Sequence, residues 1–343
     1  MSIRYPAPLQ AGDRIGVTSP SAGVSVDLRP RLDVSIEHLR AAGYEVVVGA
    51  CMDGAGVVSA PAKERAAELM AMLVDSSVRA VVPPWGGELA VELLPHLDLD
   101  AIAAAQPTWL VGYSDISTLL LAITVGTGIA TVHGQNLMDT PYRVPAPLMS
   151  WLDAVARPTG SRLTQGASTH HRAAGFDRWQ DDPTISRFTL DTPGGWSLLD
   201  PTVTDVHVAG RLIGGCIETV SVLAGTPFGD LTQFADRHAP EGLIVYVEAA
   251  EAAATDIARS LWGMRLAGWF DAATAVLVGR TRAPDSPGFT QRDAVRSALG
   301  DLGVPVVLDV DCGHVAPHLT LVNGSLAEVT LTDAIARITQ SLI

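Results

Sequence analysis

One short stretch constrains the fold of this chain more than any other. Trp109 to Val111 form an apolar run typical of a buried strand, and the run ends at Gly112. From Ile116 the apolar residues recur with helical spacing, so the pattern changes from strand to helix around Ser114. A serine on such a turn is either a nucleophile presented above the sheet edge or the N-cap of the helix. The stretch predicts an α/β fold with Ser114 at the carboxyl end of a strand.

The residues before this stretch repeat the same alternation. Short β-type runs alternate with helical segments at short spacing, which is typical of an N-terminal doubly wound parallel sheet. In such sheets, ligands bind at the carboxyl ends of the strands. We expect strands within 12–20, at 43–48, 79–84 and 109–111 and within 128–136, and helices at 34–42, 61–74 and 89–94.

Length and hydrophobic content indicate more than one core. With 343 residues, of which 48% are hydrophobic, the chain exceeds what a single core usually serves. We expect an N-terminal α/β domain over residues 1–140 and a smaller C-terminal α/β domain over residues 206–343. Strands of the second domain are expected at 206–216, 242–248, 272–280 and 304–309.

Residues 141–205 are expected to form a long connecting and lid loop, because prolines and polar residues interrupt the pattern there. The segment carries Trp151, Trp179 and Trp196. Amphipathic rings of this kind suit either a lid that lies over a substrate or a loop that its rings pin to the surface.

The net charge argues against several classes of partner. A formal charge of -14 at pH 7 disfavours nucleic acid polymers and anionic membranes, while a small anionic ligand is compatible with a local basic pocket. Cys51, Cys216 and Cys312 are widely spaced, so neither a metal site nor a disulfide framework is expected. Because no secretory leader and no long uncharged apolar run is found, we expect a cytoplasmic protein.

A glycine pair follows one of the predicted strands. Gly86 and Gly87 come after the strand at 79–84, at the same sheet edge as Ser114. Paired glycines let the backbone approach a ligand and point N–H groups at it, as an oxyanion hole requires; the alternative is a tight turn. His133 follows a strand that ends at the same edge, where it is either a site residue or structural.

Two candidate acids and a histidine come later in the chain. Glu248 ends the run at 242–248, Glu251 lies three residues further on, and His314 lies in a loop beyond the strand at 304–309. The order serine, acid, histidine occurs in several α/β hydrolases, although geometry and not order defines a triad. We favour Glu248 because it directly ends the strand, with Glu251 as its rival.

Blocks in a characteristic order extend over nearly the whole chain. They are GDRIGV (12–17) and SPS (19–21), WGG (85–87) and LLPHLD (93–98), VGYSDI (111–116), HG (133–134), GRLIGG (210–215), VE (247–248), LAGWFD (266–271), GH (313–314) and LTL (319–321). In these blocks the chain resembles the LD-carboxypeptidase family of serine peptidases, and most of all its microcin C immunity branch. The resemblance implies a class I glutamine amidotransferase-like N-terminal domain, a smaller C-terminal α/β domain and usually a homodimer.

The resemblance also implies a role for each matching residue. Ser114 is the expected nucleophile, His314 the general base and acid, and Glu248 the carboxylate that orients the imidazole. This chemistry requires no metal and no cofactor. The N–H groups expected to form the oxyanion hole are those of Asp115, Gly87 and Gly86.

The resemblance leaves two substrates open. In the immunity branch an aminoacyl group is joined through a carbonyl-nitrogen bond to a nucleotide, whereas in the murein-trimming branch an L,D bond is cut to release D-alanine from a tetrapeptide. Trp85 before the glycine pair favours the immunity branch, and Trp179 or Trp196 is expected to stack on the base. Cys216, where the family often has asparagine, removes an amide from a loop that faces the substrate. The other expected substrate contacts are Glu88 and His133.

Two further classes of protein share parts of this pattern. A doubly wound domain with glycine loops also serves as a non-catalytic small-ligand-binding module. A general serine esterase also carries a serine on such a turn, but it usually has glycine where this chain has Ile116. Serine, acid and histidine together favour the hydrolase, whose expected partner is a small peptide or an aminoacyl-nucleotide.

Overall fold

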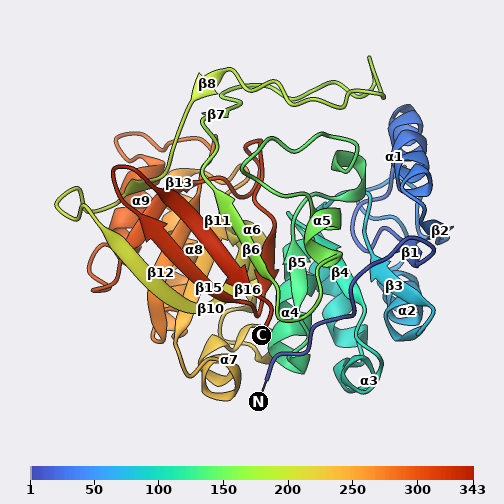
Figure 1. The fold of residues 1–343 in the computed structure, drawn as a ribbon, viewed down its shortest axis with the longest axis horizontal. Helices are drawn as coiled ribbons and strands as arrows, with labels where there is room; N and C mark the ends of the chain where they lie inside the picture. The colour runs from blue at the N-terminus through green and yellow to red at the C-terminus, as the bar shows by residue number, and fades with distance from the viewer. Residues whose placement is uncertain (1) are drawn as a thin grey trace.

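The computed structural model describes residues 2–343 and contains two main sheets that lie side by side (Figure 1). The first sheet has the order β14-β5-β4-β3-β1-β2, in which β1 to β5 run parallel and β14 is antiparallel to β5. This parallel sheet with its intervening helices confirms the predicted α/β fold. Its elements are β1 (Arg14–Val17), α1 (Arg29–Ala41), β2 (Glu45–Val48), α2 (Ala62–Val74), β3 (Val78–Val81), α3 (Leu99–Ala104), β4 (Trp109–Gly112), α4 (Ile116–Thr127), β5 (Thr131–His133), α5 (Trp151–Val155) and β14 (Leu321–Asn323).

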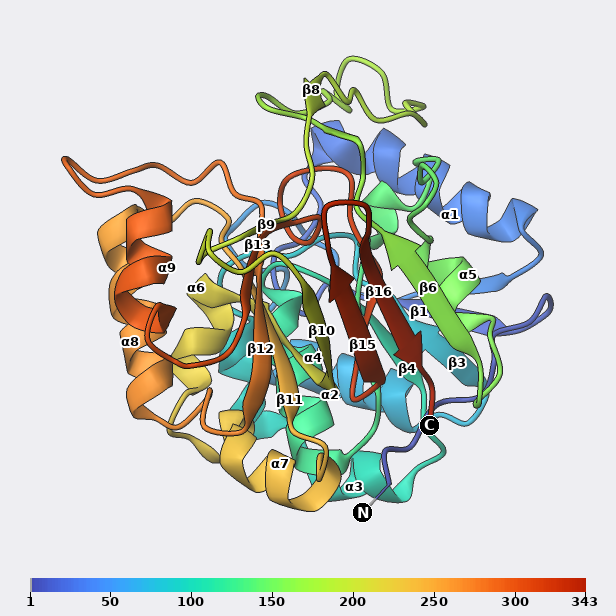
Figure 2. The same ribbon diagram turned by 60° about the vertical axis from the view of Figure 1, so that its left-hand side comes forward.

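The second sheet is mixed and has the order β6-β16-β15-β10-β11-β12-β13-β9. Strands β10 to β13 run parallel, and the strands at both edges are antiparallel. Helices α8 and α9 lie next to each other beside this sheet (Figure 2). The elements of this half, with the small β7-β8 pair, are β6 (Arg162–Gly166), β7 (His170–His171), β8 (Thr192–Pro193), β9 (Ser197–Leu198), β10 (Val206–Cys216), α6 (Ile217–Val220), α7 (Leu231–His238), β11 (Leu243–Glu248), α8 (Ala254–Leu266), β12 (Ala273–Gly279), α9 (Gln291–Leu299), β13 (Val306–Val310), β15 (Leu326–Leu331) and β16 (Ala336–Ser341).

One strand crosses between the two sheets. β14 lies late in the sequence but pairs with β5 of the first sheet, with Leu321 opposite His133. The next strand, β15, pairs with β10 and so returns to the second sheet. Residues 206–343, expected as a C-terminal domain, therefore contribute one strand to the sheet of the N-terminal half.

The connecting segment is more regular than a long loop. β6 and β9 extend the second sheet at its two edges, which the prolines and polar residues of this segment did not indicate. Between β7 and β8 the chain leaves the sheet as an arm (residues 170–193) that reaches across to α1 (Figure 1). Arg31 of α1 holds the arm by donating hydrogen bonds to the carbonyl oxygens of Pro183 at 2.8 Å and Ile185 at 2.7 Å.

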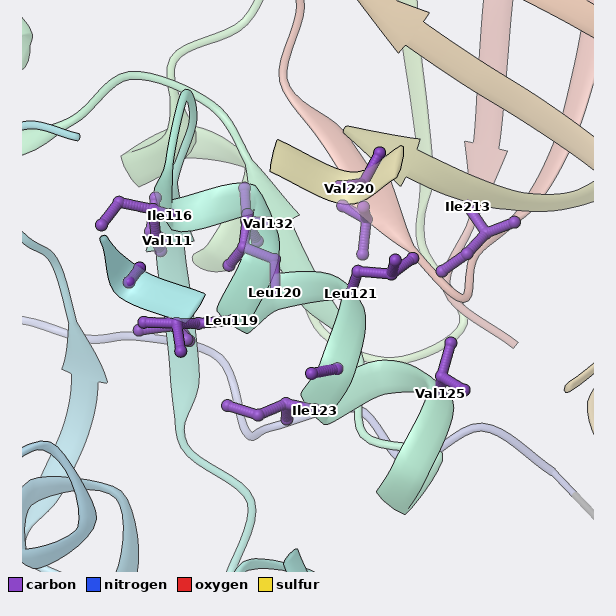
Figure 3. Close-up of a cluster of buried hydrophobic side chains, with 14 of the residues drawn as sticks. Val111, Ile116, Leu119, Leu120, Leu121, Ile123, Val125, Val132, Ile213 and Val220 are labelled. Carbon is purple, nitrogen blue, oxygen red and sulfur yellow. The ribbon is translucent and has the colours of Figure 1, made fainter. Parts of the chain in front are cut away.

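Helix α4 lies at the centre of the core. Its side chains from Ile116 to Val125 are all buried, because apolar residues surround the helix instead of forming one stripe. Figure 3 shows Leu121 of α4 near Ile213 of β10 and Val220 of α6, and all three belong to one hydrophobic cluster. α4 therefore packs against both halves of the molecule, and its N-terminal end carries the Ser114 turn.

The segment around Tyr5 lies close to the C-terminal residue, Ile343 (Figures 1 and 2). The Tyr5 hydroxyl donates a hydrogen bond to the carbonyl oxygen of Ile343 at 3.1 Å, and Arg211 donates to the same oxygen at 2.8 Å. Among residues 2–343, no helix has the length and apolar character that crossing a membrane requires.

Leu120 offers a test of the α4 core. Its side chain is fully buried, whereas Leu266 at the end of α8 is 84% exposed. We expect Leu120→Ala to lower the free energy of unfolding by about 2–5 kcal/mol, because it removes buried methyl groups and leaves a cavity. Leu266→Ala, the matched control, should change it by less than about 0.5 kcal/mol. Urea denaturation followed by circular dichroism measures both, and equal effects would contradict the position of α4 in the core.

Candidate active site

Ser114 lies on the turn between β4 and α4, where the sequence predicts it. Its φ of 63° is in the left-handed region, which a residue with a side chain adopts at a cost in energy. Asp115, and not Ser114, occupies the N-cap position of α4. The Ser114 hydroxyl is instead engaged with the imidazole of His314. The turn thus presents the hydroxyl away from the helix, as a nucleophile requires.

Asp115 and the glycine loop hold the backbone around this hydroxyl. The Asp115 carboxylate accepts hydrogen bonds from the Ser21 hydroxyl at 2.5 Å and from the Ala90 N–H at 2.7 Å. A Cβ atom at Gly86 would lie 2.7 Å from the Cβ of Ser114, so a side chain there would force the loop away. The N–H groups of Asp115 and Gly87 donate to no acceptor within residues 2–343, which leaves both available to a ligand.

His314 links the serine to a buried carboxylate. Its Nε2 lies 3.0 Å from the Ser114 Oγ, and its Nδ1 lies 2.9 Å from the Glu248 Oε2. Ser114 comes from the first sheet, whereas Glu248 ends β11 of the second and His314 follows β13. Glu251, the rival acid, is exposed on the loop beyond β11, and its carboxylate forms no hydrogen bond or ion pair with His314. The three groups therefore meet at the junction of the two sheets.

The charges of this pair stabilise one another. Burial alone lowers the pKa of His314, but the Glu248 carboxylate outweighs that effect and raises it above its usual value. Burial alone raises the pKa of Glu248, but His314 and His133 outweigh it, and the pKa lies well below its usual range. Glu248 is therefore ionised at neutral pH, and the Nδ1 of His314 donates its proton to the carboxylate.

Glycines make room for the Glu248 side chain. A Cβ atom at Gly313, whose φ is 95°, would collide with the Glu248 carboxylate. One at Gly279 would lie 2.6 Å from the Cβ of Glu248. The second carboxylate oxygen, Oε1, is buried, and the Nε2 of His133 lies 3.8 Å from it. His133 thus lies behind the carboxylate and not in the cavity where substrate contact was expected.

Cys216 lies beside the same groups. Burial, reinforced by Glu248 and Glu218, raises the pKa of its thiol well above the usual value. The thiol therefore stays protonated and is a poor nucleophile at neutral pH. Cys216, Glu248 and His314 each offer one ligand atom within 4.8 Å of the others, so the set is able to hold a divalent metal ion. Such an ion would have to displace the proton that His314 shares with Glu248.

One cavity of about 610 Å³ opens on the reacting groups. Ser114 and His314 line it together with the glycine loop and the first part of the arm. Three of its lining residues are glutamates and one is an arginine, which are Glu88, Glu218, Glu251 and Arg282.

A second cavity of about 330 Å³ adjoins the first, because Phe176, Arg282 and His314 line both. Six of its sixteen lining residues are Phe, Tyr or Trp, and five are charged. The Trp179 indole N–H donates a hydrogen bond to the Tyr142 hydroxyl at 2.9 Å. The Tyr142 and Phe188 rings are stacked, with their centroids 4.3 Å apart. The aromatic residues that line this cavity are Trp85, Tyr113, Tyr142, Phe176, Trp179 and Phe188.

The tryptophans of the connecting segment have different surroundings. Trp179 lines the aromatic cavity, and its contact with a substrate stays a prediction. Trp196 instead belongs to the core of the second sheet, where its indole N–H donates to Asp311 at 2.9 Å. The difference arises because the chain returns to that sheet at β9, where Trp196 and Leu199 are buried. Trp151 is likewise buried in the core.

Several residues of the two cavities were not predicted. Glu218 lies in the first turn of α6, two residues after Cys216, and Cys216 was expected to face the substrate. Its place in the sequence could therefore have indicated its place in the cavity. Tyr142, Phe176 and Phe188 lie in the connecting segment, which has no periodic pattern to show which side chains face inward. Arg282 follows β12, and its only signal in the sequence is that ligands bind at the carboxyl ends of parallel strands.

Comparison with known proteins places the chain among peptidases. The family model described as the LD-carboxypeptidase N-terminal domain matches residues 15–134, and the model of the C-terminal domain matches residues 209–329. A putative carboxypeptidase of Vibrio cholerae is 28% identical over 326 residues, which cover 92% of this chain and 91% of that protein. The microcin C7 self-immunity protein MccF of Escherichia coli is 28% identical over 92% of this chain and 90% of MccF.

More distant relatives and solved structures extend the comparison. The murein tetrapeptide carboxypeptidase of Pseudomonas aeruginosa is 27% identical over 73% of this chain and 70% of that protein. A structure of MccF in complex with glutamyl sulfamoyl guanosine covers 98% of both chains with a TM-score of 0.80 at 24% identity, which shows the shared fold. Another structure, with aspartyl sulfamoyl adenosine, has the same TM-score.

The coupling between His314 and Glu248 is open to measurement. We expect the pKa of His314 to lie above the usual 6.5, because the Glu248 carboxylate favours the imidazolium. Glu248→Gln removes that charge and leaves the burial, so the pKa of His314 should fall. NMR titration of the imidazole ring protons compares the two proteins, with His38 of α1 as the control that should titrate alike in both. An unchanged His314 titration would contradict the coupling.

Proposed function

This chain belongs to the LD-carboxypeptidase family of peptidases, and from that premise we propose that Ser114, Glu248 and His314 form its catalytic triad. We further propose that the bond they cut joins an aminoacyl group to the nitrogen of a nucleotide conjugate. The observation that carries the triad is the continuous chain of contacts from the Ser114 hydroxyl through His314 to Glu248, at 3.0 and 2.9 Å.

The first step is attack by Ser114. A serine hydroxyl is a weak nucleophile at neutral pH, so the Nε2 of neutral His314 accepts its proton as the Oγ bonds to the acyl carbon. Glu248 accepts a hydrogen bond from Nδ1, which leaves Nε2 as the basic atom, and stabilises the imidazolium that forms. His314 then delivers the proton to the departing nitrogen. Water then attacks the acyl carbon while the Nε2 of His314 accepts its proton, and His314 returns that proton to the Ser114 Oγ as the acyl–Oγ bond breaks and the carboxylic acid leaves.

The oxyanion of each tetrahedral intermediate requires donors that are already in place. Among the residues that the structure describes, no acceptor pairs with the N–H groups of Asp115 and Gly87, which lie beside the Ser114 turn. The N-terminal end of α4 adds its positive partial charge at the same place. Asp115 contributes through its backbone, because its carboxylate already accepts from Ser21 and Ala90.

The aromatic cavity supports the nucleotide conjugate as substrate. It adjoins His314, on the side where a leaving group would lie if the acyl group occupies the larger cavity. Aromatic rings stack on nucleobases with useful affinity, and Trp179 is part of this wall. D-Alanine, the leaving group in murein trimming, has no ring to stack and would leave most of this cavity empty. The murein reaction is therefore the second candidate.

Other parts of the proposal rest on different grounds. The homodimer rests on the family resemblance, whereas the cytoplasmic location and the division into domains over 1–140 and 206–343 rest on the sequence pattern. Size-exclusion chromatography with light scattering tests the oligomeric state directly.

Two substrates compared side by side test the proposal. We expect an aminoacyl sulfamoyl adenosine to be cleaved faster than a tetrapeptide ending in D-alanine, with both products identified by mass spectrometry. Ser114→Ala should lower kcat by at least ~10⁴-fold, because the nucleophile is lost. Ser76→Ala, an exposed serine outside both cavities, is the matched control and should retain full activity. Release of D-alanine alone would replace the nucleotide substrate by the murein peptide, and undiminished activity of Ser114→Ala would overturn the triad.

A further inference from the structure

The larger cavity has an uneven distribution of charge. Three glutamates line it, and they come from separate parts of the chain. Glu88 follows the glycine loop, Glu218 lies in α6, and Glu251 lies on the loop after β11. Their convergence beside Ser114 follows from the fold, since the three segments are distant in sequence.

One of these glutamates is fixed by the backbone. The Oε1 of Glu218 accepts hydrogen bonds from the N–H groups of Ala250, Glu251 and Ala252 at 2.8, 3.0 and 3.1 Å. Glu218 thus shapes the loop that carries Glu251. By contrast, the side chains of Glu88 and Glu251 have no hydrogen-bond or ion-pair partner within residues 2–343.

The basic groups of the larger cavity do not neutralise the carboxylates of Glu88 and Glu251. His314 is paired with Glu248. Arg282 donates to the carbonyl oxygen of Gly175 at 2.6 Å and lies over the Phe176 ring at 4.5 Å. Because Arg282 lines both cavities, it lies at their junction, where it suits the anionic linkage of a conjugate.

The carboxylates around Glu88 affect its ionisation. Partial burial, and then the charges of Glu251, Asp115 and Glu218, raise the pKa of Glu88. Carboxylates that line the same cavity repel one another, and a cation bound between them offsets this repulsion.

We propose that the larger cavity selects acyl groups that carry positive charge, with Glu88 and Glu251 as the specificity-determining residues. Every aminoacyl group carries one positive charge on its α-ammonium, and a lysyl, ornithyl or arginyl group carries a second on its side chain. This inference rests on the proposed function, because it assigns the larger cavity to the acyl group. It sets this chain apart from MccF, whose solved structures hold the acidic glutamyl and aspartyl conjugates.

Binding to the Ser114→Ala protein tests the charge preference without turnover. Lysyl, norleucyl and glutamyl sulfamoyl adenosine differ in side-chain charge, and calorimetry measures the Kd of each. We expect the lysyl compound to bind at least tenfold more tightly than the norleucyl compound, and the glutamyl compound to bind most weakly. The lysyl advantage should shrink as salt is added, because exposed charges are screened.

Charge-neutral variants assign the effect to residues. Glu88→Gln and Glu251→Gln, each made in the Ser114→Ala protein, should reduce the preference for lysyl over norleucyl by several-fold. Glu64→Gln is the matched control, since Glu64 is an exposed glutamate of α2 outside the cavity, and the preference should stay unchanged. Equal loss in all three variants would assign the preference to overall charge and overturn the inference.

The outcomes separate this inference from the proposed function. If the unmodified protein cleaves all three conjugates with equal kcat/KM, the proposed function stands and the charge preference is overturned. If it cleaves none but the lysyl compound binds most tightly, the preference stands and the proposed reaction fails. Tightest binding of the glutamyl compound, or no binding of any of the three, overturns the inference.

Discussion

Burial of the Glu248 carboxylate is the constraint on which the rest of the site depends. A buried carboxylate is costly unless it is paired, and here His314, which follows β13 of the same sheet, supplies the partner. Gly279 and Gly313 leave the space that the side chain fills. Because the carboxylate and the imidazole come from one sheet and Ser114 from the other, the geometry of the three groups is set by how α4 packs between the halves.

The sequence predicts most of this arrangement for physical reasons. Ser114 and Glu248 each end a strand of strongly apolar sequence, so their positions follow from the strands themselves. Glu251 was a reasonable rival in sequence but lies beyond the strand end, where the loop turns it outward. β10 has the predicted bounds, whereas α1 begins at Arg29, ahead of the expected helix at 34–42, because Pro30 is tolerated in a first turn.

What the sequence did not predict depends on contacts between distant segments. β14 is three residues long, and nothing in LVN indicates which sheet it joins. His133 and Trp196 were expected at the substrate, but both are buried by neighbouring strands, His133 behind Glu248 and Trp196 beside Asp311. The aromatic residues between 140 and 190 do not recur at regular spacing, so the sequence does not indicate which of them face inward. The arm is held by its hydrogen bonds to Arg31 and not by an amphipathic pattern of its own.

The crossing of β14 has a consequence for how the gene can be cut and rejoined. A fragment that ends before residue 206 would lack the edge strand that pairs with β5, and the remainder would carry an unpaired strand, so the halves are unsuited to separate expression. The chain ends, by contrast, are held together through Tyr5, Arg211 and Ile343. A circular permutant that links the segment around Tyr5 to that around Ile343 and opens in the arm would keep every strand pair of both main sheets.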